Sequence, residues 1–236
     1  MQEEVAKHTK KLYQAVTKPG HTVFEKLKEI AIEIFIIVFA VTLSIWLHSW
    51  SDHRHEQKEV REFLKGLRDD LTKDTAMLKA KRATVARLDF GYRSLSALPG
   101  TPAADTISDK KISGYLDVDI SVLRPAIGRY EGFKSSGKME TIEDDSLKQS
   151  MLKYYEQRMP DIIYGENFVN SIQLKLLDLE MDNKMPLREF IKADKVQSLL
   201  SISHQNFDNN IREYSELLHE VEKIIKLIDS TGVSHK

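Results

Sequence analysis

The apolar stretch over residues 29–50, EIAIEIFIIVFAVTLSIWLHSW, limits what this chain can fold into more than any other part of it. Between positions 30 and 47 the only charged side chain is Glu33. A helix of about 20 apolar residues, at 1.5 Å per residue, spans the roughly 30 Å hydrocarbon core of a bilayer. A single segment can cross there only as a helix, because every backbone N–H and C=O must be satisfied internally. We therefore predict a transmembrane helix over residues 29–50. The alternative is a buried core helix of a soluble protein.

Three side chains of this stretch suggest where it meets water. Trp46 and Trp50 lie near its end, and an apolar ring with a polar N–H suits the membrane–water interface. Glu33 lies about one turn from Glu29, so its side chain can reach the headgroup region, where the helix dipole favours a negative charge. Two other roles are open for Glu33, because ionisable groups in membrane helices often serve function. It could pair with a basic group of a partner subunit, or it could line an ion path.

Residues 1–28 form a short, Lys-rich polar lead. The apolar stretch is too long for the core of a signal peptide, and no small-residue cleavage site follows it, so we expect an uncleaved anchor. Basic residues flank the stretch on both sides. The short lead and the tryptophans at the far end favour a cytoplasmic N-terminus. We therefore expect a single-pass protein of the inner membrane, with the larger C-terminal part in the periplasm.

Composition and motifs argue against several classes of function. Lys+Arg number 35 and Asp+Glu 36, a formal net charge of −1 that gives no electrostatic case for nucleic acid. The absence of Cys excludes disulfides, thiol nucleophiles and Cys–zinc sites. The sequence contains no nucleophile-elbow, zinc-protease or dinucleotide-binding motif. We therefore expect no catalytic residues and no cofactor.

Residues 51–98 show a heptad pattern that predicts a membrane-proximal helical rod continuing from the transmembrane helix. Asp74 and Lys81 occupy two positions of this seam. They could pair between helices of separate subunits, which suggests a homo-oligomer or a complex with another membrane protein. The apolar seam positions are Val60, Leu64, Leu67, Leu71, Leu78, Val85, Leu88, Tyr92 and Leu95.

The remaining residues, 99–236, predict further helices and no strands. We expect helices over 106–116, 120–135 and 144–182, with Pro160 kinking or splitting the last of them near Met159. Thr141, Asp144 and Asp145 resemble a helix cap, and Pro186 suits the start of a final helix. The fold class is therefore all-α, an antiparallel helical bundle. The final helix carries a second seam of Leu200, Phe207, Ile211, Tyr214, Leu218, Val221, Ile225 and Ile228.

The motif formed by Lys134, Ser135, Ser136 and Gly137 has two interpretations. As a site, it could present hydroxyls and backbone N–H groups to an anion beside its lysine. As structure, Gly137 would end a helix in the left-handed conformation, while the serines bond the last exposed backbone groups. A phosphate-binding P-loop is excluded, because neither its spacing nor its preceding strand is present. The structural interpretation is the one we expect.

The same region resembles a known family. Residues 130–142, YEGFKSSGKMETI, are followed by DSLK at 145–148 and LKYY at 152–155. This pattern is similar to that of an uncharacterised single-pass membrane family common in Bacteroidota-type bacteria. Family members also have Gly-Glu-Ile at the opening of the span and Asn-Trp-Asn at its close, matched here only in part by residues 32–34 and 49–51. The resemblance covers about residues 29–160, and it implies an architecture but no activity.

A metal site can be sketched at the end of the apolar stretch. His48, Asp52 and His55 fall at i, i+4 and i+7 of a continuing helix, which gathers two imidazoles and a carboxylate on one face. The neighbouring basic residues fit a lipid-headgroup collar better, so we expect no metal. His204 and His219 each stand alone on a polar helix and are expected to be surface residues.

Two functions follow from this organisation. The first is a non-enzymatic, membrane-anchored helical scaffold or adaptor subunit, with the lipid bilayer and another protein as its partners. The second is a sensory or ligand-binding helical ectodomain. The 28-residue lead is too short to be an output domain, so a sensor of this kind would signal through a partner. The state in which the protein is purified in mild detergent would discriminate between the two.

Overall fold

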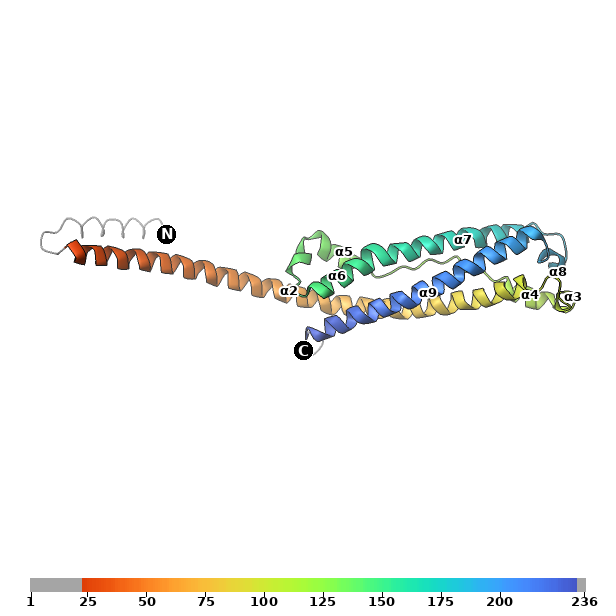
Figure 1. Cartoon of the computed structure of the whole chain (residues 1–236), viewed down its shortest axis with the longest axis horizontal. Coiled ribbons are helices and arrows are strands. Elements are labelled where there is room, and N and C mark those ends of the chain that lie inside the picture. The colour runs from red at the N-terminus through yellow and green to blue at the C-terminus, as the bar shows by residue number, and fades with distance from the viewer. Residues whose placement is uncertain (1–22, 233–236) are drawn as a thin grey trace. The chain divides into compact units, whose positions relative to one another are not determined.

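The computed structural model describes residues 23–232, and all regular elements in that range are helices (Figure 1). The prediction of an all-α fold is confirmed. The chain divides into two units, Met1–Glu59 and Val60–Lys236, and the boundary falls inside helix α2, Val23–Ser96. This boundary lies nine residues after the predicted end of the membrane helix at position 50. The polar lead predicted over residues 1–28 lies outside the described residues as far as position 22.

The described part of the first unit is the N-terminal portion of α2. It contains an apolar stretch long enough to cross a membrane, and none of that stretch is buried within the chain. Its one threonine, Thr42, donates its hydroxyl to the carbonyl of Val38 at 2.8 Å, so the polar atom is satisfied inside the helix. A helix whose apolar side chains all face outward needs a cover that this unit does not supply.

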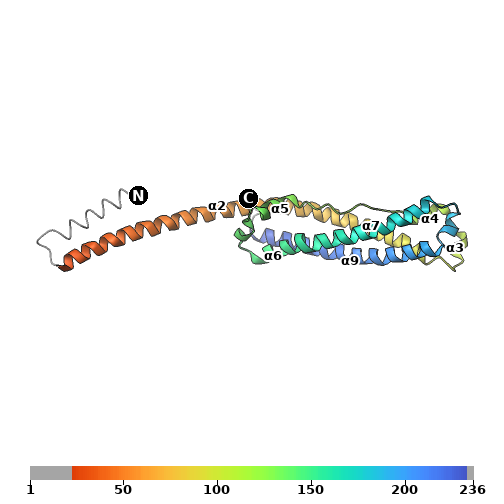
Figure 2. The same ribbon diagram turned by 90° about the horizontal axis from the view of Figure 1, so that it is seen from above.

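The second unit is a bundle of three long helical segments. These are residues 60–96 of α2, then α6 (Asp145–Lys153) with α7 (Met159–Met181), and α9 (Asp194–Ser230). An ion pair joins Arg68 Nε to Asp229 Oδ1 at 2.6 Å, and Gln197 donates to the carbonyl of Leu95 at 3.3 Å. The start of this part of α2 therefore meets the end of α9, and its end meets the start of α9. The two helices are antiparallel, as predicted (Figures 1 and 2).

The heptad seams form the core. All nine predicted seam positions of α2 are buried. On α9, five of the eight predicted positions are fully buried, while Ile211, Leu218 and Ile225 are only partly buried. Leu217 and Ile224 are fully buried in place of the last two. The reason is that buried positions alternate in steps of three and four along the helix, at 200, 203, 207, 210, 214, 217, 221, 224 and 228.

Five short elements connect the long helices. They are α3 (Ala103–Thr106), α4 (Asp109–Tyr115), α5 (Gly128–Ser135), a 3₁₀ turn (Lys138–Thr141) and α8 (Leu187–Phe190). Helix α4 replaces the helix predicted over 106–116. Asp144 caps α6 by accepting the N–H of Leu147 at 2.9 Å, as the sequence indicated. A helix does follow Pro186, but it is only α8, and α9 begins separately.

Pro160 interrupts the helix predicted over 144–182. Residues Tyr154–Arg158 form a π-helical segment between α6 and α7, in which the N–H of Met159 donates to the carbonyl of Tyr154. Proline has no N–H to continue the regular helical pattern, and π-helical turns are one way in which a helix accommodates the break. The prediction of a break near Met159 is confirmed.

The helix predicted over 120–135 is wrong in its first half. Only α5 is helical there, and residues 117–127 form no regular secondary structure, with a tight turn at the end where the N–H of Ile127 donates to the carbonyl of Pro125 at 2.9 Å. We call residues 117–127 the strap. It runs along the bundle from the end of α4 to the start of α5 (Figures 1 and 2). Pro125 lies inside it, and the residue before a proline is disfavoured in helical conformation.

Candidate functional site

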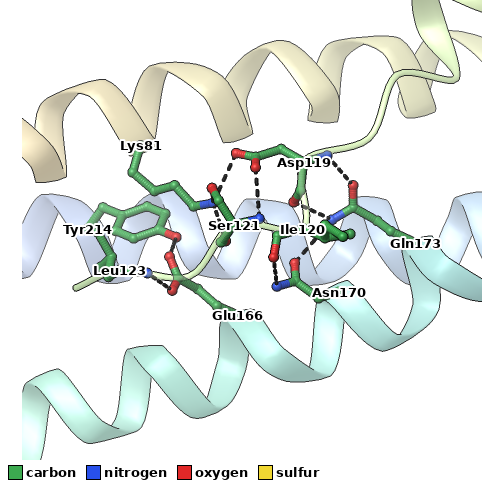
Figure 3. A network of polar contacts seen from close by, with 9 residues as sticks. All are labelled: Lys81, Asp119, Ile120, Ser121, Leu123, Glu166, Asn170, Gln173 and Tyr214. Atoms are coloured by element: carbon green, nitrogen blue, oxygen red, sulfur yellow. Dashed lines mark hydrogen bonds and ion pairs between the residues drawn. The ribbon is translucent and has the colours of Figure 1, made fainter.

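The strap is held by side chains of the bundle and not by another strand. Backbone N–H and C=O groups that leave water must find partners, and an extended segment usually finds them in a neighbouring strand. The described residues, 23–232, contain no strand. Buried and partly buried polar side chains of the helices take that role, and they form the network of Figure 3.

Helix α7 supplies three of these side chains. Gln173 accepts the N–H of Asp119 at 3.0 Å and donates to the same residue's carbonyl at 3.2 Å, as a facing strand would. Asn170 donates to the carbonyl of Ile120 at 2.9 Å. Glu166 accepts the N–H of Leu123 at 2.7 Å. The spacing of i, i+4 and i+7 places the three on one face of α7, so they follow the strap along its length.

Helix α2 holds the strap from the other side. The ammonium of Lys81 contacts Asp119 Oδ2 at 3.0 Å, the carbonyl of Ser121 at 2.6 Å and the Ser121 hydroxyl at 2.8 Å. Asp74 accepts the N–H of Ala126 at 3.0 Å. The strap therefore links α2 to α7 through bonds to its main chain.

The carboxylates of Glu166 and Asp74 each also accept a tyrosine hydroxyl. Tyr214 of α9 donates to Glu166, and Tyr154 of the π-helical segment donates to Asp74 at 3.2 Å. Burial raises the pKa of both carboxyl groups, and the bonds from the strap amides and the tyrosines oppose that rise. Two carboxylate–tyrosine pairs thus clamp the strap amides of Leu123 and Ala126, three residues apart.

A small polar cavity lies beneath the strap, with room for about one water molecule. Its lining includes Lys81, Glu166, Tyr214 and Asn210, the last of which is 5% exposed. A Cβ added at Gly165 would lie 3.2 Å from Asn210 Oδ1, so the glycine lets α7 approach α9 at this point. Chemically, the arrangement binds polypeptide main chain.

Asp74 and Lys81 therefore act differently from the prediction. The sequence suggested that they pair between helices of separate subunits. Both are instead engaged with the strap of their own chain, because the strap runs alongside the part of α2 in which they lie. They are not available as an inter-subunit pair in this conformation.

The motif of Lys134, Ser135, Ser136 and Gly137 ends a helix. Gly137 has a φ of 74°, the left-handed conformation predicted for it. The hydroxyls of Ser135 and Ser136 donate to backbone carbonyls three residues earlier, at 3.2 and 2.7 Å. Lys134 contacts Glu156 Oε1 at 2.6 Å, so the lysine and both hydroxyls have partners within the chain.

The proposed metal ligands at the end of the apolar stretch are not brought together. His48 Nε2 lies 3.3 Å from Asp52 Oδ2, whereas His55 pairs with Glu59 at 3.9 Å. Within residues 23–232 no group of three or more His, Asp or Glu side chains is placed to hold a metal ion.

The two tryptophans and Glu33 lie on the same helix. Trp46 and Trp50 are both exposed, and the guanidinium of Arg54 lies 4.8 Å from the centre of the Trp50 ring. A ring with a basic neighbour suits a headgroup layer. Glu33 lies within the apolar stretch of α2.

Sequence reasoning missed several residues that matter. His204 was expected on the surface, yet its Nδ1 lies 2.5 Å from Asp89 Oδ1, in a partly buried pair between α9 and α2. The strap had a signal, because polar and β-branched residues alternate over positions 117–122 before Pro125. The only signal in the sequence for Glu166, Asn170 and Gln173 is their helical spacing, and a solvated helix face shows the same spacing.

Comparison with known proteins identifies no relative: no family model, no curated protein and no solved structure matches the chain. Its function is therefore inferred from the apolar stretch of α2, the bundle and the strap.

Proposed function

We propose that this protein is a membrane-anchored helical scaffold or adaptor subunit without enzymatic activity. The observation that carries the proposal is the apolar stretch of α2, whose side chains are not buried by any described part of the chain. Large apolar side chains such as Phe35, Phe39 and Ile45 are exposed along it. Burying apolar surface gains about 25 cal/mol per Å², so such a stretch is strongly favoured in lipid.

The topology that we propose is a single pass through the inner membrane. The N-terminus lies in the cytoplasm and the bundle in the periplasm. The Lys-rich lead and the exposed tryptophans at the far end support this orientation. The resemblance to a single-pass family of Bacteroidota-type bacteria agrees with the architecture, and we infer that the chain belongs with that family.

The bundle supports a binding role more than a chemical one. Its most buried charged groups, Asp74 and Glu166, are each bonded to a strap amide and a tyrosine hydroxyl. A general base or nucleophile would need to face an accessible substrate. Here the polar groups are used to hold polypeptide in place, which is what an adaptor does.

Two experiments test the proposal. Washing membranes at alkaline pH in carbonate should leave the protein in the pellet, and clean release into a detergent-free supernatant would refute membrane anchoring. Purification in mild detergent should then yield a homo-oligomer or a fixed companion protein. Recovery as a lone monomer would count against the adaptor.

A sensory role is the second candidate, and one observation favours it. A surface cavity of about 260 Å³ lies between α2 and the strap, lined in part by Met77, Lys81, Thr84, Asp119 and Val122. This is slightly below the range of about 300–1,000 Å³ that is typical of small-molecule sites, so it would suit a small ligand. Native mass spectrometry of the purified protein would distinguish the roles, because a sensor should carry a stoichiometric small molecule there.

A further inference from the structure

We propose that the groove beneath the strap is a binding site for an extended polypeptide segment of a partner subunit, and that the strap occupies this site in its absence. The inference rests on the proposed scaffold role and deepens it, since it names the kind of partner that the scaffold would hold.

The groove recognises main chain. Five bundle side chains, from Asp74, Lys81, Glu166, Asn170 and Gln173, bond to backbone atoms of the strap. The atoms they bond are the N–H groups of residues 119, 123 and 126 and the carbonyls of residues 119, 120 and 121. These are groups of the main chain, so a segment that follows the same course as the strap, including its turn near Pro125, offers them whatever its side chains are. Partner recognition by an exposed row of main-chain partners is the principle of strand addition to sheet edges.

The groove places few requirements on the side chains of the segment that binds in it. Leu123, at 4% exposed, is the only fully buried side chain of the strap, whereas Ile120 is 50% exposed. An incoming segment therefore needs one aliphatic anchor of leucine size. It also needs an acidic or hydroxyl residue near the position of Asp119, where the ammonium of Lys81 is directed.

The strap is suited to release. Segments that bury few apolar side chains open with a smaller free energy than core helices do, and one buried leucine is a small anchor for eleven residues. An incoming segment would re-form the bonds that the strap gives up, so the buried carboxylates would not be left without donors. A partner in the same bilayer is present at a high effective concentration, which favours the exchange.

Peptide binding tests the site directly, with the full chain in detergent micelles. The probe is a fluorescent peptide with the sequence of residues 117–127, acetylated and amidated at its ends. The Leu123→Ala variant weakens the chain's own strap while keeping all five groove side chains. It should bind the peptide at least about tenfold more tightly than the wild type, whose intact strap competes.

Two controls separate main-chain recognition from adhesion. A peptide N-methylated at the residues equivalent to Leu123 and Ala126 lacks both clamped donors and should lose binding at least about tenfold. Gln173→Leu, introduced beside Leu123→Ala, should also weaken binding of the unmodified peptide. Equal binding of the two peptides would overturn the proposal. So would the absence of binding to a Leu123→Ala variant with a native circular dichroism spectrum.

Hydrogen exchange of the wild-type protein keeps the test decisive if the variant does not fold. The amides of Leu123 and Ala126 should exchange about 100-fold faster than those of Val221 and Ile224 in the core of α9, because the strap opens without the bundle. Equal protection would show that the strap never leaves the groove, and the proposal would fall. Both readouts are obtained in micelles, so they can fail while carbonate-resistant anchoring holds, and the reverse is also true.

Discussion

At the scale of single residues, the bundle places charged and amide side chains where a helical core normally has leucine. Glu166 is 2% exposed, and it accepts hydrogen bonds from the amide of Leu123 and from the hydroxyl of Tyr214. A buried carboxylate is tolerated only where donors surround it. The strap amide is one of these donors, and the carboxylate is in turn the acceptor that the amide requires. Each of the two groups therefore supplies a hydrogen-bond partner to the other.

Two replacements of Glu166 should show how much of its contribution to stability comes from hydrogen bonding and how much from side-chain shape. Glu166→Leu removes the acceptor from two buried donors, and each unpaired donor costs about 1–3 kcal/mol. We expect the free energy of unfolding to fall by roughly 2–5 kcal/mol in urea titrations of the detergent-solubilised protein. Glu166→Gln keeps an acceptor for Leu123 and should change stability by less than about 1 kcal/mol. Similar losses in the two variants would contradict this account.

The same carboxyl predicts the sign of a pH effect. Burial raises the pKa of Glu166 above its value in the unfolded chain. The folded state therefore binds the proton more tightly, and the resulting stabilisation is complete below the unfolded pKa and is lost as the pH rises through the folded pKa. Wild type should gain stability relative to Glu166→Gln as the pH falls from about 7 to about 4. Asp74 is present in both proteins, so its contribution cancels. A difference that stays constant or shrinks on acidification would contradict the expectation.

At the scale of elements, the long helices followed from apolar periodicity and the strap did not. A seam repeated every three and four residues can be buried only as a helix, whatever its neighbours are. The strap is short, and its alternation of polar and β-branched residues covers only positions 117–122. The groove could not be derived from sequence, because the spacing of Glu166, Asn170 and Gln173 is also typical of a solvated helix face. Whether that face is solvated or covered by the strap depends on the tertiary structure.

Two glycines test how closely the elements approach. A Cβ at Gly91 of α2 would lie 2.6 Å from the backbone carbonyl of Tyr115 at the end of α4, whereas a Cβ at Gly114 meets nothing within 4 Å. Gly91→Ala should cost about 1–3 kcal/mol, because backbone must move. Gly114→Ala should be neutral or gain up to about 1 kcal/mol from helix propensity. Thermal melting of both variants compares them, and a Gly91→Ala protein as stable as Gly114→Ala would show that the close contact is absent.

At the scale of the whole molecule, the two units differ in the polarity of the surface that they expose. The apolar stretch of α2 exposes large apolar side chains, whereas the bundle buries its apolar seams. Composition predicted the first property and periodicity the second. Basic residues flank the apolar stretch at both ends, so the proposed orientation is based on the short lead and the tryptophans and not on a difference in flanking charge.

Single cysteines can settle the orientation, since the chain has no Cys of its own. We expect a membrane-impermeant maleimide to label Ser51→Cys in spheroplasts and to leave Gln2→Cys unlabelled until the membrane is permeabilised. Each variant serves as the control for the other, because lysis exposes both sides. Labelling of Gln2→Cys alone in intact spheroplasts would reverse the topology. The bundle would then meet cytoplasmic partners, while the anchor and the groove beneath the strap would be unchanged.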